Sequence, residues 1–245
     1  MYKSKVLVGF VLMCYFLFAI FEFSGNEVVA YYFNSLIVPL ITIIYILFIE
    51  PKSKLFLMFL VCYSLSDILG IVIDNMPYDE SQKLYDFEYY VGNSLYILAY
   101  FFLIIKISKS LSFSHIFKNF KLHLLVLCVL NVYLLYVLHD IIDPNLVLES
   151  DYYLELTYNI VVLFLLSLSL LNYFYKDNTK SLYLFLGALC IVFSEVLDIA
   201  YIYVSQRYFL NFLATTLALG AFCFFFQQSK LLNIANEEEK YIVTE

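Results

Sequence analysis

Eight apolar runs, each about long enough to cross a membrane, constrain the fold of this chain more than any other feature. A helix rises about 1.5 Å per residue, so roughly 20 residues cross the ~30 Å hydrocarbon core of a bilayer. Hydrophobic residues make up 63% of the chain, whereas apolar residues are about half of an ordinary soluble domain. The runs are 6–23, 30–49, 55–73, 89–105, 122–139, 152–171, 182–203 and 209–226.

These runs predict an all-α fold, a polytopic transmembrane helix bundle of about eight membrane-spanning helices. Residues 1–226 would form the transmembrane domain, and residues 227–245 a polar cytoplasmic C-terminal tail. Within the second run, Pro39 lacks the N–H that a helix needs, so we expect a kink there.

The 14 Lys and Arg residues fall unequally on the two sides of such a bundle. Twelve lie on the side of the two termini, and Lys83 and Arg207 lie on the other. Because cytoplasmic loops carry an excess of Lys and Arg, we expect both termini in the cytoplasm of a multi-pass protein of the cell inner membrane. The pattern contains no nucleic-acid-binding feature and leaves the oligomeric state open.

Carboxylates inside apolar runs are the main candidates for function. Residues 187–201, GALCIVFSEVLDIAY, contain Glu195 and Asp198, which share one helix face, and the third run contains Asp67. An ionised carboxylate in hydrocarbon costs several kcal/mol, so such acids indicate a polar, functional interior. An acid near a helix end can instead lie among the lipid headgroups, and this alternative stays open for Glu195 and Asp198.

Other polar residues fall in the same half of the membrane as these acids, which indicates a polar interior on the non-cytoplasmic side. In addition, Ser66-Asp67-Ile68-Leu69 in the third run resembles Ser194-Glu195-Val196-Leu197 in the seventh. A parallel four-plus-four repeat would bring the two acids to similar depth. Tyrosines at the outer helix ends, such as Tyr31, are typical of an interfacial aromatic belt. The polar residues of this half are Glu22, Asn34, Asp67, Asn93, Glu155, Asn159, Glu195, Asp198 and Asn211.

Metal and cofactor sites have no support in the sequence. The five cysteines lie singly in apolar runs, and none belongs to a C-x-x-C pair. The three histidines lie in loops or at helix ends, far apart along the chain, which disfavours a three-histidine zinc site. We therefore predict no metal and no cofactor.

Several short motifs resemble those of the YhhN-type lysoplasmalogenases, eight-helix integral membrane proteins. Gly187-Ala188 followed by Ser194-Glu195 resembles the family signature G-A-x5-S-[D/N], and Ser66-Asp67-Ile68-Leu69 resembles G-D-x-L. Val38-Pro39-Leu40 is similar to K-P-L, and Gly92 stands where the family has G-x5-H. The departures are Val38 for lysine, Ser66 for glycine, Glu195 for aspartate, Leu98 for histidine and Thr216 near a His or Gln position.

The resemblance implies hydrolysis of the vinyl ether bond of a lysoplasmalogen, with the bilayer and a lysophospholipid-type substrate as partners. Asp67 and Glu195 would be the catalytic pair, one protonated and one ionised near neutral pH. Two alternatives remain. A lipid-binding or small-molecule transport protein could use the same acids without catalysis, and a structural or sensory protein could use them to join helices. The implied substrate-binding residues are Asp198, Ser66, Ser194, Asn93, Asn34 and Thr216.

Overall fold

The computed structural model describes residues 2–50, 52–76, 81–142 and 149–242, with side chains described for 6–50, 52–76, 85–142 and 150–231. Throughout these ranges the regular elements are helices and no strand occurs. Eight helical segments in them are long and apolar enough to cross a membrane. The predicted all-α polytopic bundle is therefore confirmed, and the chain is a multi-pass membrane protein.

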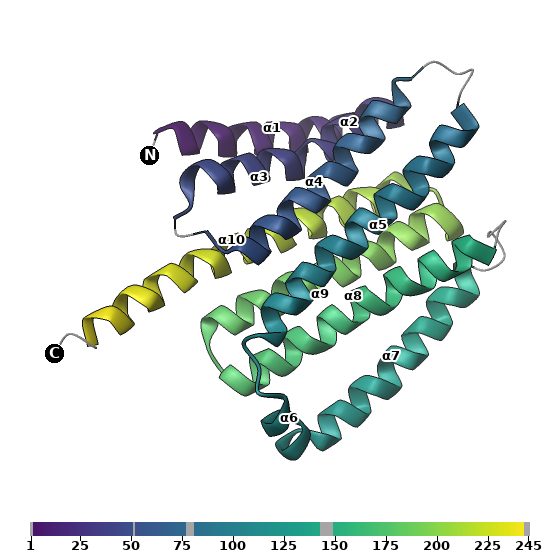
Figure 1. Ribbon diagram of the computed structural model, residues 1–245. Helices are drawn as coiled ribbons and strands as arrows, with labels where there is room; N and C mark the ends of the chain where they lie inside the picture. The colour runs from purple at the N-terminus through teal and green to yellow at the C-terminus, as the bar shows by residue number, and fades with distance from the viewer. Residues whose placement is uncertain (1, 51, 77–80, 143–148, 243–245) are drawn as a thin grey trace.

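The spans run side by side, and the two ends of the chain lie at the same end of the bundle (Figure 1). An even number of crossings produces this arrangement. A short helix, α6, precedes the fifth span, and a π-helical turn, η3, ends the seventh. The elements in chain order are α1 (Tyr2–Phe23), α2 (Glu27–Ser35), α3 (Ile37–Phe48), α4 (Lys54–Asp74), α5 (Ser81–Ser108), α6 (Phe113–Asn119), α7 (Lys121–Ile142), α8 (Glu149–Lys176), α9 (Thr179–Ile199), η3 (Ala200–Val204) and α10 (Tyr208–Ile242).

The second span is broken into two helices, as the proline within it predicts. Helix α2 ends at Ser35 and α3 begins at Ile37, with Leu36 between them. Pro39 has no N–H to donate to the carbonyl of Ser35 four residues earlier, so the helix cannot continue unchanged through this point. The break matters for function because residues on both sides of it line the central cavity described below.

Tight pairing of α4 with α5 and of α9 with α10 holds the centre of the bundle together. Phe59, Tyr100, Phe222 and Phe225 are almost fully buried where these helices meet. The rings of Phe59 and Phe222 stack with their centroids 5.7 Å apart. In contrast, α7 lies at the edge of the bundle beside α8 (Figure 1) and presents apolar residues outward.

Several helices extend beyond the predicted runs, and α5 and α10 extend furthest. Helix α5 begins at Ser81 rather than near residue 89, and α10 continues to Ile242 rather than ending at residue 226. Gln228 and Ser229 are buried, and Gln228 Oε1 accepts a hydrogen bond of 2.9 Å from Lys106 Nζ. The predicted tail therefore begins inside α10, and the first residues of the tail still pack in the bundle. Residues 243–245 of that tail lie outside the described residues.

Candidate functional site

A cavity of about 200 Å³ lies among the helices and brings three acids together. Asp67 reaches it from α4, while Glu195 and Asp198 reach it from α9. The two motif acids therefore line the same cavity although they belong to the third and seventh spans. None of the described residues that line the cavity is basic. Its other lining residues are Tyr31, Asn34, Ser35, Ile37, Val38, Tyr63, Tyr96, Tyr158, Ser194, Thr215, Ala218, Leu219 and Phe222.

Asp67 is held by a tyrosine of the neighbouring helix. The Tyr96 hydroxyl on α5 donates to Asp67 Oδ1 over 2.6 Å. Asp67 is only 8% exposed, so this hydrogen bond replaces water that the carboxyl group would otherwise bind. Short O–H···O bonds to a carboxylate are among the stronger hydrogen bonds in proteins. The contact fixes the position of Asp67 at the cavity wall.

Glu195 receives tyrosine hydroxyls from two helices. Tyr100 on α5 donates to Glu195 Oε1 over 2.6 Å, and the Tyr158 side chain on α8 forms a second hydrogen bond with the carboxyl group. Tyr63 lines the same cavity and interacts electrostatically with Asp67, Glu195 and Asp198. The carboxyl groups thus share one tyrosine-lined chamber rather than occupying separate sites.

The serines that precede the two motif acids make equivalent contacts. Ser66 Oγ on α4 donates to the carbonyl of Gly92 on α5 over 2.9 Å. Ser194 Oγ on α9 donates to the carbonyl of Ala214 on α10 over 2.8 Å. In each case the serine joins its span to the following one, which agrees with a four-plus-four repeat. The hydroxyls predicted to bind substrate therefore hold helices together, although Ser194 also lines the cavity.

The other predicted substrate-binding residues separate into two groups. Asn34 and Asp198 line the cavity. Asn93 does not; its amide donates to the carbonyl of Tyr89 over 2.8 Å. Thr216 also lies outside the cavity, where it hydrogen-bonds Tyr15 of α1 over 2.8 Å. Its neighbour Thr215 lines the cavity instead, because successive residues of a helix point about 100° apart.

A second hollow, of about 410 Å³, adjoins the cavity toward the end of the bundle opposite the chain termini. Tyr31 and Tyr96 line both spaces. Polar groups surround this second hollow, among them Glu88 and Asn93. We call it the polar vestibule. It places polar side chains next to the acid cavity, on the side away from the chain termini.

The tyrosines around the acids are the functional residues that the sequence interpretation missed. Tyr63, Tyr96, Tyr100 and Tyr158 lie within the spans rather than at their ends. A hydroxyl in hydrocarbon needs a partner, so a tyrosine deep in an apolar run was a detectable signal. Helical spacing was a second signal, since Tyr96 and Tyr100 are four residues apart and share a face. Tyr31, interpreted as part of an aromatic belt, also faces the cavity.

Two other acids of the same half of the bundle lie apart from this chamber. Glu155 accepts a hydrogen bond of 2.8 Å from the Tyr89 hydroxyl and does not line the cavity. Glu22 is 1% exposed and interacts with Asn211, and its Oε1 atom has no hydrogen-bond partner among the described residues. Burial of an acid therefore does not by itself mark the candidate site.

Comparisons with protein-family models, curated proteins and solved structures find no match for this chain. The interpretation of the cavity therefore depends on its own residues. Within the described side chains, no group of three His, Cys, Asp or Glu residues is placed to hold a metal ion. The polar groups that line the cavity are carboxyl groups, hydroxyls of tyrosine, serine and threonine, and the amide of Asn34.

Proposed function

We propose that the chain is an integral membrane hydrolase that cleaves the vinyl ether bond of lysoplasmalogen-type lysolipids in this cavity. One observation carries the proposal. Asp67 and Glu195, from different halves of the chain, line the same chamber, and each is hydrogen-bonded by a tyrosine at 2.6 Å. Paired carboxyl groups in one enclosed site are suited to proton transfer coupled to stabilisation of a cation.

The reaction needs two groups in different protonation states. A carboxylic acid transfers its proton to the vinyl carbon that is not bonded to oxygen, which leaves an oxocarbenium ion. A neighbouring carboxylate stabilises that positive charge and takes a proton from the attacking water. The resulting hemiacetal breaks down to a fatty aldehyde and the free hydroxyl of the glycerophospho-headgroup. The sum is addition of one water molecule, with no oxidant or cofactor required.

The hydrogen bonds suggest which acid has which role. Glu195 is contacted by two tyrosine side chains, whereas Tyr96 is the tyrosine that donates to Asp67. Donors aimed at a carboxyl group stabilise its ionised form. We therefore assign Asp67 as the proton donor and Glu195 as the ionised partner. Asp198, beside Glu195 on the same helix, would orient the water.

The leucine at the family histidine position does not conflict with this proposal. Leu98 is 42% exposed and does not line the cavity, whereas Tyr96 and Tyr100 on the same helix contact the acids. The polar groups of α5 that serve the chamber are therefore tyrosines.

Aldehyde release from ether lysolipids tests the function directly. We expect purified protein in detergent or nanodiscs to form fatty aldehyde from vinyl ether lysolipids and none from saturated-ether analogues, which have no double bond to protonate. The assay follows aldehyde and free headgroup over several hours across a range of pH. If a lysolipid raises the melting temperature but no aldehyde forms at any pH, the hydrolase proposal is contradicted. The ligand-binding function described next would then take its place.

A non-catalytic ligand site is the second candidate. It is favoured by the three acids and four tyrosines around the cavity and by the lack of a basic residue among its described lining. Such a chamber suits a ligand that carries an amine or quaternary ammonium group, because carboxylates and aromatic faces both attract cations. Ligand binding without turnover distinguishes this function from hydrolysis.

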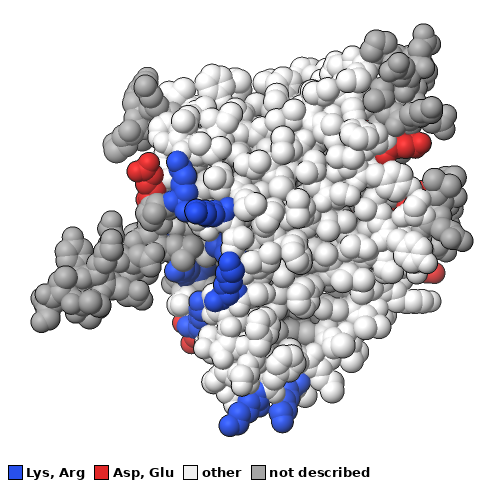
Figure 2. Space-filling view, viewed as in Figure 1, with Lys and Arg blue, Asp and Glu red and all other residues white. Residues whose placement is uncertain are grey.

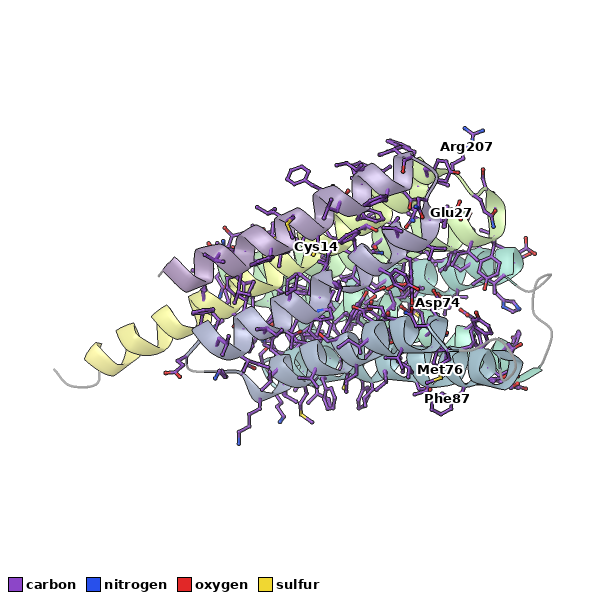
Figure 3. All side chains as sticks on the ribbon, turned by 90° about the horizontal axis from the view of Figure 1, so that it is seen from above. Cys14, Glu27, Asp74, Met76, Phe87 and Arg207 are labelled. Carbon is purple, nitrogen blue, oxygen red and sulfur yellow. The ribbon has the colours of Figure 1, made fainter. Side chains whose placement is uncertain are left out.

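We also infer that both termini face the cytoplasm. The Lys and Arg side chains on the face drawn in Figure 2 gather at the end of the bundle where α1 begins. Figure 3 shows Arg207, Glu27 and Asp74 toward the opposite end. This asymmetry supports the orientation expected from positively charged cytoplasmic loops. The acid cavity would then lie in the outer half of the membrane.

Reporter cysteines at the two ends test this topology. In a variant without the five native cysteines, we expect Lys118→Cys to react only after the membrane is permeabilised, because it would face the cytoplasm. Arg207→Cys should react with an impermeant maleimide in intact cells. The measurement is the fraction labelled before and after permeabilisation. Labelling of both residues from the same side would contradict the inferred topology.

A further inference from the structure

An apolar groove lies on the lipid-facing side of the acid cavity, between α1, α3 and α10. It encloses about 100 Å³, and all of its described lining side chains are apolar. Val8 and Cys223 are exposed on its open side. Ile44 in its lining is buried, and Ile41 and Phe226 are partly buried. The groove is therefore accessible from the bilayer and offers no hydrogen bond to a polar ligand.

The groove adjoins the acid cavity. Leu219 and Phe222 of α10 line both spaces. From Leu219 to Phe226 the groove follows α10 for about 10 Å at the usual helical rise. On the other side of the cavity lies the polar vestibule, reached past Tyr31 and Tyr96. The three spaces thus form a series that changes from polar, through acidic, to apolar.

We propose that this groove binds the hydrocarbon chain of a single-chain amphiphile whose polar part occupies the acid cavity and the polar vestibule. This assignment adds a chain-binding site to the proposed hydrolase. It rests on the hydrolase proposal for the identity of the polar part of the ligand. In a vinyl ether lysolipid the reactive carbons join the chain to the headgroup. A chain in the groove and a headgroup in the vestibule place those carbons beside Asp67 and Glu195.

The groove positions the chain rather than attracting it. Lipid tails are as apolar as the side chains of the groove, so a chain gains no hydrophobic free energy by leaving the bilayer for it. Its contribution is alignment, which holds reacting atoms near catalytic groups. A ligand whose polar part is held in the acid cavity must place its chain in the groove, so a side chain that fills the groove should exclude long-chain ligands by steric conflict and spare ligands whose chains end before Phe222.

Two cysteine substitutions give a matched test. Cys223→Trp places a large ring in the groove, whereas Cys128→Trp places the same ring in another apolar hollow, lined by α6, α7 and α8 and far from the acids. Binding of saturated-ether lysolipids with long and very short chains is measured on the full-length protein in nanodiscs. We expect Cys223→Trp to weaken long-chain binding at least tenfold and to leave short-chain binding unchanged. Cys128→Trp should change neither.

Saturated-ether ligands keep this test separate from the hydrolase proposal, because they cannot be hydrolysed at a vinyl group. Retained short-chain binding shows that the variant is folded; if Cys223→Trp does not fold, Val8→Trp obstructs the groove from α1. Unchanged long-chain binding in a folded groove variant would overturn the assignment. Equal losses for long and short chains would overturn it as well, because the ring would then act on the acid cavity rather than on the chain.

Discussion

Changing Asp67 to Asn, or Glu195 to Gln, is expected to lower vinyl ether hydrolysis by at least about a hundredfold, the usual contribution of a positioned acid or base. Each amide keeps the shape of the side chain and can still accept a tyrosine hydrogen bond, but it can neither deliver a proton nor carry a negative charge. The folded yield and the melting temperature should change little. The measurements are kcat/KM for aldehyde release and the thermal melt of each purified variant.

Glu155→Gln is the matched control for these variants. Glu155 also belongs to the spans and also accepts a tyrosine hydrogen bond, 2.8 Å from Tyr89, but it lies outside the cavity. Its amide variant should keep activity within a few-fold of the native protein. Similar losses for all three variants would indicate general disruption of the bundle and would count against a specific Asp67–Glu195 pair.

Replacing Gly187 with Ala is expected to destabilise the bundle by about 1–3 kcal/mol, the usual range for overpacking a core. A Cβ atom at Gly187 would collide with the ring of Phe225 on α10. Phe225 is 1% exposed, so its ring cannot move aside without disturbing the packing of α9 against α10. The loss can be measured as a lower midpoint in denaturant or thermal unfolding of the purified protein.

Gly220→Ala provides the comparison on the partner helix. No atom lies within 4 Å of the Cβ that it would add. Because alanine favours a helix over glycine by up to about 1 kcal/mol in water, stability should stay constant or rise slightly. If both substitutions lowered the unfolding midpoint equally, the effect would come from losing glycine itself and not from the contact with Phe225.

Gly187 also shows what a short motif encodes. In the sequence, Gly187-Ala188 followed by Ser194-Glu195 resembled a catalytic signature. In the structure, two of these four residues serve the contact between α9 and α10. Gly187 admits the ring of Phe225, and Ser194 donates to the carbonyl of Ala214, while Ala188 is fully buried in the core. Ser194 and Glu195 line the cavity, and Glu195 is the one with a carboxyl group.

The sequence by itself determined the membrane class, the eight spans and the break near Pro39. These features depend on local quantities, since hydrophobicity over about 20 residues decides insertion and a missing N–H disrupts its own helix. It also identified Asp67, Glu195 and Asp198, because a carboxyl group is costly in hydrocarbon wherever the helices lie. The lengths of α5 and α10 were underestimated, because helices can extend past the apolar stretch that marks a span.

Only the tertiary structure decided which polar groups meet. The sequence contains 24 tyrosines, and although position within a span indicates which of them need a partner, no local pattern shows which acid each one contacts. That choice depends on the rotation of α5 about its axis, which places Tyr96 against Asp67 and Tyr100 against Glu195. In the same way, the rotation of α10 about its axis turns Thr215 toward the cavity and Thr216 toward Tyr15. Helix rotation is set by packing between distant segments, and a single sequence does not record it.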